Sequence, residues 1–238
     1  MRKDVGGFWP TSRAGSVPTP NSLELQGAWR ARPQTCCGGF PHPLGAPTLA
    51  TLAPRVQPLR FLFAHPGDLH APPLDAFARH IAPVMPCEFL PLPSDQADTA
   101  LVEQFQTKLD TPSRTLIGGF SLGARIAAMV SLVAPVAGLV GLSFPFHRHG
   151  QPLERHGLET LRAVSVRTLL IQGTRDSHGN EAQVRGMGPF PPHVQVVWLA
   201  DANHRWSSRG AQTPEDHAKD AVLAIQSFAH GLVSRPHV

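Results

Sequence analysis

The sequence predicts an α/β fold, a doubly wound and mostly parallel sheet of about six strands with helices on both faces. Three observations support this prediction. From residue 59 onward, short apolar runs alternate with segments whose apolar residues recur with helical spacing. The strand-like runs are continuously apolar, which is typical of parallel strands that are buried on both faces. A Gly-rich turn joins one of these runs directly to a helix-favouring stretch, as in a strand that crosses over into a helix.

The first 58 residues differ in composition from the rest of the 238-residue chain. They are rich in Pro, Gly, Ser, Thr and Arg and show no sustained strand or helix period, so they cannot bury enough apolar surface to offset the entropy of ordering. We therefore expect a disordered or non-core extension at residues 1–58, one folded domain at 59–233 and a short tail at 234–238. Residues 48–52 are the only strand candidate before the domain.

Composition argues against several classes of function. The six basic and two acidic side chains of residues 1–58 account for the whole net charge of +4, so the domain is neutral and has no electrostatic footprint for nucleic acid. No stretch approaches the roughly 20 apolar residues of a membrane span, and the N-terminus lacks the apolar segment of a secretory signal. The three cysteines have no metal-ligand spacing with histidines, which favours reduced thiols. We expect a cytoplasmic protein.

The elements follow in order from residue 59. An apolar run closed by Pro66-Gly67 predicts the first strand, and the six predicted strands lie at residues 59–65, 87–92, 115–117, 136–144, 168–171 and 194–199. Helical spacing of apolar residues predicts helices at 74–81, 101–109, 124–133 and 154–164. A last helix begins after Thr213, the predicted N-cap, with Pro214 at its first position and Asp216 three residues after the cap.

The turn after the predicted strand at 115–117 has the pattern Gly119-Phe-Ser121-Leu122-Gly123. A turn this sharp between a strand and a helix brings the residues two before and two after its tip into close contact, so both must be glycine. Gly119 and Gly123 occupy these two places, and Ser121 lies at the tip. The turn therefore exposes the Ser121 hydroxyl beyond the end of the strand, as a serine nucleophile requires.

Two later strands end in residues that complete this chemistry. Asp176 follows the strand at 168–171, and His204 follows the strand at 194–199. Because the carboxyl ends of parallel strands meet at one edge of a sheet, we expect both side chains to lie near Ser121. His204 would act as the base that takes the serine proton, and Asp176 would orient its imidazole. Asp201 is an alternative acid, although a carboxylate so close in sequence to His204 is expected to cap the loop.

The remaining polar groups near this edge have more ordinary interpretations. The developing oxyanion needs two donors, and we expect these to be the N–H groups of Leu122 and Gly67, since Pro66 has no N–H. His147 and His149 follow the strand at 136–144; we interpret them as surface-loop residues, with pocket lining as the alternative. We expect neither a metal nor a cofactor, because no His-Glu-x-x-His or similar spacing occurs.

The motifs resemble those of the α/β-hydrolase superfamily, and within it a dienelactone-hydrolase-like branch that includes a testis-expressed protein and the hydrolase-like domain of a subunit of the NSL acetyltransferase complex. The resemblance covers residues 59–231. Its motifs are Gly118-Gly-Phe-Ser-Leu-Gly-Ala-Arg125, the segment Leu142-Ser-Phe-Pro-Phe-His147 with Gly150-Gln-Pro152, and Leu170-Ile-Gln-Gly-Thr-Arg-Asp176. It implies the α/β-hydrolase fold and a Ser-Asp-His triad, but no substrate.

The sequence thus favours a serine hydrolase that cleaves a small ester, thioester or related acyl bond, with a small-molecule acyl compound as its partner. The alternative is a hydrolase-like binding or scaffold protein without turnover, with a protein partner in contact with residues 1–58. The Pro66 that follows His65, together with the complex-subunit relative, motivates this alternative.

Overall fold

The computed structural model describes residues 59–151 and 156–234. The extension predicted at 1–58, the strand candidate at 48–52 and residues 235–238 of the predicted tail lie outside the described residues. The six strands are β1 (Arg60–Pro66), β2 (Cys87–Leu92), β3 (Thr115–Phe120), β4 (Gly138–Leu142), β5 (Thr168–Gly173) and β6 (Val194–Leu199). The helices are α1 (Leu74–Ile81), α2 (Asp98–Gln106), α3 (Leu122–Ser131), α4 (His156–Ala163), α5 (Glu181–Gly186) and α6 (Pro214–Val233), with a 3-10 turn η1 (Pro112–Arg114).

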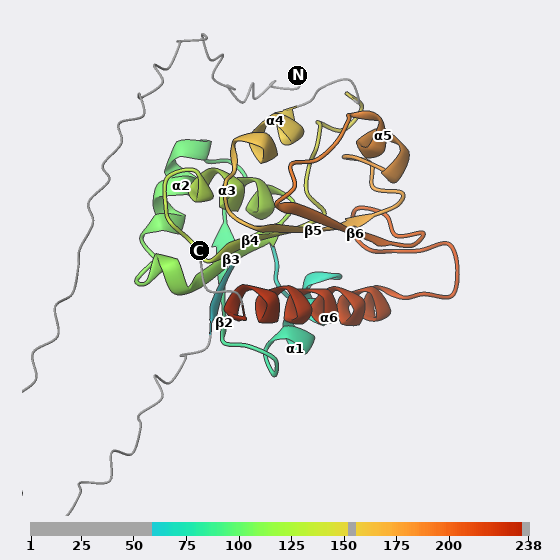
Figure 1. Cartoon of the computed structure of the whole chain (residues 1–238). Coiled ribbons are helices and arrows are strands. Elements are labelled where there is room, and N and C mark those ends of the chain that lie inside the picture. The colour runs from blue at the N-terminus through green and yellow to red at the C-terminus, as the bar shows by residue number, and fades with distance from the viewer. Residues whose placement is uncertain (1–58, 152–155, 235–238) are drawn as a thin grey trace, which may run out of the picture. The chain divides into compact units, whose positions relative to one another are not determined.

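The strands form one sheet in the order β2-β1-β3-β4-β5-β6, and every neighbouring pair is parallel. Helices α1 and α6 cover one face of the sheet, and α2, α3, α4 and α5 cover the other (Figure 1). Each face buries its own apolar cluster: Phe63, Phe77 and Trp206 belong to the first, and Phe105 and Ile126 to the second. The predicted fold class is confirmed.

The strand order changes direction at β1, and this decides where a site can form. The chain runs from β1 outward to β2 and then returns to place β3 on the other side of β1. Ligands of such sheets bind in the crevice beyond the carboxyl ends of the strands, at the point where the order reverses. The ends of β1 and β3, next to Gly67 and Ser121, lie at this point.

The main differences from the sequence prediction concern β3, β4 and α5. β3 extends to Phe120 although it contains two glycines, because β1 and β4 pair with it on both sides. β4 ends at Leu142, since Ser143 has a φ of +46°, which strand geometry excludes. The short helix α5 was not predicted; a capping box between Asn180 and Gln183 starts it. Among the described residues, no helix combines the length and the apolar character needed to cross a membrane.

Candidate active site

Ser121 is the single residue between the end of β3 and the start of α3. Its backbone has φ 52° and ψ −113°, a conformation that is uncommon and strained for a residue with a side chain. Two backbone hydrogen bonds hold it there: the Ser121 N–H donates to the carbonyl of Leu142 (2.9 Å), and the Ser121 carbonyl accepts from the N–H of Arg125 (3.1 Å). The hydroxyl therefore lies at the tip of a turn that the strand and the helix both fix.

The turn is closed so tightly that two of its residues must be glycine. A Cβ on Gly119 would lie 2.4 Å from the carbonyl carbon of Gly123 and 2.5 Å from the carbonyl oxygen of Ala64. A Cβ on Gly123 would lie 2.0 Å from that same Ala64 oxygen. The turn therefore packs directly against the end of β1, which brings the segment that follows β1 to the same edge of the sheet as Ser121.

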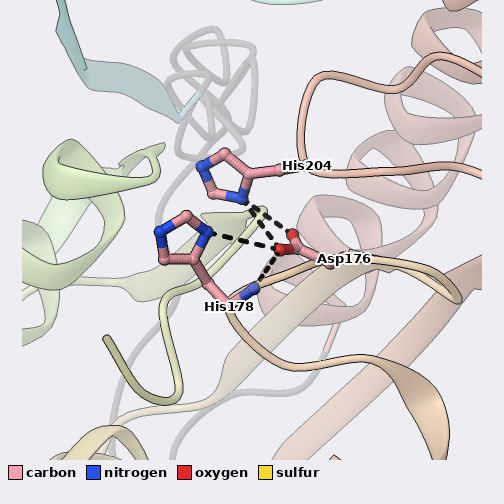
Figure 2. A group of neighbouring side chains, drawn as sticks. All are labelled: Asp176, His178 and His204. Carbon is pink, nitrogen blue, oxygen red and sulfur yellow. Dashed lines mark hydrogen bonds and ion pairs between the residues drawn. The ribbon is translucent and has the colours of Figure 1, made fainter. Parts of the chain in front are cut away.

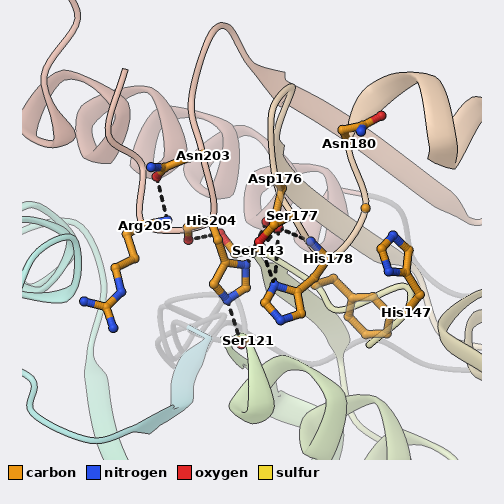
Figure 3. A network of polar contacts seen from close by, with 12 residues as sticks. Ser121, Ser143, His147, Asp176, Ser177, His178, Asn180, Asn203, His204 and Arg205 are labelled. Atoms are coloured by element: carbon orange, nitrogen blue, oxygen red, sulfur yellow. Dashed lines mark hydrogen bonds and ion pairs between the residues drawn. The ribbon is translucent and has the colours of Figure 1, made fainter. Parts of the chain in front are cut away.

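His204 joins the two other predicted residues in one line of hydrogen bonds. Its Nδ1 lies 3.0 and 2.9 Å from the two carboxylate oxygens of Asp176 (Figure 2), and its Nε2 lies 2.9 Å from Ser121 Oγ (Figure 3). In the arrangement that satisfies all these contacts, Nδ1–H donates to Asp176 and the serine hydroxyl donates to Nε2. The three residues come from the β3–α3, β5–α5 and β6–α6 connections.

Asp176 is a buried carboxylate, and its side chain has no exposed surface. Burial by itself would raise its pKa, but hydrogen bonds from His178 and His204 outweigh burial and hold the pKa of Asp176 below its ordinary value. The backbone N–H of His178 also donates to Asp176 Oδ1 (2.8 Å). The carboxylate is therefore ionised at neutral pH and fixed in place beside His204.

Sequence reasoning missed His178. Its ring lies 4.3 Å from the ring of His204, measured between centroids, and its Nδ1 is 3.7 Å from Asp176 Oδ1. The signal that could have found it is the Asp-x-His spacing, because an aspartate often accepts the N–H of the residue two positions later and so turns the chain back. Figure 3 shows His178 and His204 side by side next to Asp176.

The loop that carries His204 is held by a serine that sequence reasoning also missed. Ser143 follows β4, is fully buried, and donates its hydroxyl to the carbonyl of His204 (3.0 Å). The same Ser143 oxygen accepts the indole N–H of Trp206 (3.0 Å), and Trp206 is itself fully buried. The Asn203 side chain accepts the N–H groups of Arg205 (2.9 Å) and Ser207 (3.0 Å), which closes the loop.

The two predicted oxyanion donors lie at the ends of neighbouring strands. Leu122 is the first residue of α3, so its N–H has no acceptor within the helix. Gly67 directly follows β1 and has a φ of +75°, which favours glycine. His65, two residues before Gly67, is buried, and this burial is the main cause that lowers its pKa. The roles of Leu122 and Gly67 as donors stay a prediction.

Other candidate residues have structural roles. The Asp201 carboxylate pairs with Arg175 (2.9 Å) and accepts the N–H of Gly210 (3.0 Å), as expected of a residue that caps the loop. His149 is exposed, but His147 is buried, so its interpretation as a surface residue is wrong. The His147 ring contacts the carbonyl of Arg148 and the side chain of Gln183, which belongs to α5.

The structure also brings together a set of metal-ligating groups that no sequence spacing indicated. Asp176, His178 and His204 each offer one ligand atom, and these atoms all lie within 4.8 Å of one another. In the part of the chain that the structure describes, no other three His, Cys, Asp or Glu side chains are grouped in this way.

Comparison with known proteins places this site in a family. The model of the alpha/beta hydrolase domain family matches residues 92–230, which is more than half of the chain and includes Ser121, Asp176 and His204. No curated protein sequence matches the chain.

Solved structures share the fold at low sequence identity. Est1E from Butyrivibrio proteoclasticus is 10% identical over 75% of this chain and 90% of its own, with a TM-score of 0.55. The haloalkane dehalogenase DbeA from Bradyrhizobium elkani is 13% identical over 76% and 92%, also with a TM-score of 0.55. A thermophilic esterase from Thermogutta terrifontis is 13% identical over 74% and 91%, with a TM-score of 0.53. These structures share the fold, but they do not share one reaction.

Proposed function

The chain belongs to the alpha/beta hydrolase domain family, and from that premise we propose that it is a serine hydrolase which cleaves a small ester, thioester or related acyl bond. The observation that carries the proposal is the continuous line of hydrogen bonds from Ser121 Oγ through the His204 ring to Asp176. A serine hydroxyl is a weak nucleophile, and this arrangement is the one that activates it.

In the proposed reaction, Ser121 Oγ attacks the acyl carbon while His204 Nε2 takes the hydroxyl proton. The negative charge of Asp176 stabilises the imidazolium that forms and keeps its Nδ1–H pointed at the carboxylate. The carbonyl oxygen becomes an oxyanion, which the N–H groups of Leu122 and Gly67 would bind. The imidazolium then gives its proton to the leaving group, and an acyl group remains on Ser121.

Water releases that acyl group by the same route in reverse. His204 Nε2, now neutral, removes a proton from water as the water oxygen attacks the acyl carbon. The bond to Ser121 Oγ then breaks, and His204 returns the proton to it. The buried position of Asp176 supports this cycle, because a charge in a low-dielectric surrounding interacts more strongly with the imidazolium than an exposed one.

Labelling with a fluorophosphonate probe tests the proposal, because the probe reacts only with an activated serine. We expect the wild-type protein to be labelled, Ser121→Ala to take no label and His204→Ala to be labelled at least a hundredfold more slowly. Ser131→Ala is the matched control: Ser131 lies in α3, its hydroxyl donates only to the Ala128 carbonyl, and its loss should leave labelling unchanged.

Turnover of p-nitrophenyl acetate, measured in parallel, separates the hydrolase from a protein that merely has its shape. Ser121→Ala should reduce the rate by about 10³-fold or more. Equal labelling of the wild type and Ser121→Ala would contradict the proposal. Folded wild-type protein that neither takes label nor turns over the ester would favour the inactive, hydrolase-like binding protein instead.

A further inference from the structure

We propose that Asp176, His178 and His204 also bind a divalent transition-metal ion, with zinc as its representative, and that the bound ion switches the hydrolase off. The metal site rests on the arrangement of these three side chains alone. Its inhibitory effect rests, in addition, on the function proposed above. Free metal would therefore act as a reversible inhibitor that competes with the catalytic hydrogen bonds rather than with substrate.

The distances between the ligand atoms suit a single ion. Asp176 Oδ1 lies 3.0 Å from His204 Nδ1 and 3.7 Å from His178 Nδ1. A tetrahedral zinc ion with bonds of about 2.0–2.2 Å separates its ligand atoms by roughly 3.3–3.6 Å, between these two values. Both imidazole rings are turned toward the carboxylate in Figure 2, so small side-chain movements suffice.

The chemistry of the three groups also fits. Imidazole nitrogen together with carboxylate oxygen is a ligand set that zinc uses in proteins, and a water molecule would complete the tetrahedron. The Asp176 side chain has no exposed surface, whereas those of His178 and His204 are 28% and 19% exposed, so an ion can reach the carboxylate past the two rings. The His178 N–H, which donates to Asp176 Oδ1, orients the carboxylate as outer-shell groups of metal sites do.

A metal ion at this position would prevent catalysis because it changes the tautomer of His204. A neutral imidazole carries one proton, and catalysis needs that proton on Nδ1 so that Nε2 can accept from Ser121. An ion on Nδ1 moves the proton to Nε2, which then donates to Ser121 Oγ and has no lone pair for the serine proton. The imidazole keeps its one proton and no electron is transferred in this exchange, so removal of the ion lets the proton return to Nδ1 and restores the base.

His178 is the residue that distinguishes the proposed metal site from a Ser-His-Asp triad alone. In the reaction proposed above the His178 imidazole takes no proton and touches no reacting atom; it only helps to keep the Asp176 carboxylate ionised. The metal site, by contrast, cannot form from Asp176 and His204 alone. The competing explanation is that His178 only completes the turn after Asp176 through its backbone N–H, in which case its ring contributes nothing to metal affinity.

Calorimetric titration with zinc tests the site directly, without any need for activity. The protein is the full chain without a histidine tag and with Cys36→Ser and Cys37→Ser, which removes two thiols outside the described residues. We expect one equivalent of zinc to bind, and His178→Ala and His204→Ala each to weaken binding at least tenfold while circular dichroism stays unchanged. His149→Ala is the matched control, because its exposed ring lies 5.6 Å from that of His178 but outside the ligand set, and it should bind zinc as the parent does.

Ester hydrolysis with increasing zinc tests the consequence, with each protein compared with its own rate in the presence of a chelator. Zinc should abolish the parent's activity, the chelator should restore it, and His178→Ala should need at least tenfold more zinc for half inhibition. Zinc binding that His178→Ala does not weaken would overturn the metal site. If zinc binds as expected but the protein has no esterase activity, the metal site stands and the proposed function is refuted. If the protein hydrolyses the ester but binds no zinc, the proposed function stands and the metal site is refuted.

Discussion

Replacing Ser143 with alanine tests how the loop that carries His204 is held in place. The Ser143 hydroxyl makes two hydrogen bonds of 3.0 Å, one to the carbonyl of His204 and one from the indole N–H of Trp206. Alanine keeps the backbone and nearly the same volume, so the change removes these bonds and little else. It therefore measures what a single buried hydroxyl contributes to the position of the proposed base.

The magnitude follows from what each partner loses. Trp206 is fully buried, so its indole N–H would be left without an acceptor, which costs about 1–3 kcal/mol. The carbonyl of His204 belongs to a residue of intermediate exposure, and water can replace the lost donor at little cost. We therefore expect a loss of about 2 kcal/mol in the free energy of unfolding. For a domain of this size, that loss lowers the Tm by roughly 4–8 °C.

Urea denaturation of Ser143→Ala measures this loss, with Ser131→Ala as the matched control. Ser131 is also buried, but its hydroxyl bonds only to the carbonyl of Ala128 in its own helix, and alanine favours that helix. The control should lose under about 1 kcal/mol, because no buried donor is left unpaired. The reduced stability of Ser143→Ala should be accompanied by slower fluorophosphonate labelling of Ser121, since His204 is held less firmly.

A double-mutant cycle isolates the hydrogen bond itself. Trp206→Phe removes the indole N–H, so Ser143→Ala should cost less in that background than in the wild type, with a coupling of about 1 kcal/mol. The reasoning is refuted if Ser143→Ala unfolds within about 0.5 kcal/mol of the wild type, or if its cost is the same whether residue 206 is Trp or Phe.

Two further changes test the turn and the buried histidines. Gly123→Ala should lose about 2 kcal/mol or more, because its Cβ would lie 2.0 Å from the carbonyl oxygen of Ala64, whereas Gly186→Ala, whose Cβ meets nothing within 4 Å, should be neutral or slightly stabilising in the same denaturation assay. Burial lowers the pKa of His65 and of His217 in the folded chain, so the unfolded chain binds protons first as the pH falls. The free energy of unfolding should therefore decrease below about pH 6.5, and a value that is constant or rises from pH 7.5 to 5.5 would contradict this.

The local sequence pattern was sufficient to predict those helices and strands whose bounds depend on a few neighbouring residues. The strands predicted at 87–92 and 194–199 and the helix at 74–81 coincide with β2, β6 and α1. The capping box of α6, between Thr213 and Asp216, is present as its spacing indicates. The end of β3 depended on pairing with other strands instead. Its two glycines suggested that the turn begins early, but both belong to the strand, because β1 and β4 form hydrogen bonds with it on either side.

Reading along the chain was enough to predict which residues could act together at the edge of the sheet. Chain order and position after strands named Ser121, Asp176 and His204, because in a parallel sheet every strand delivers its last residues to the same edge. How close these side chains lie, and which groups surround them, depends on how the whole domain packs. The contacts of Ser143 with the His204 loop, and of the His178 ring with Asp176 and His204, depend on loop paths and side-chain rotamers set by packing between distant segments. This packing cannot be predicted from a pattern of residues along the chain.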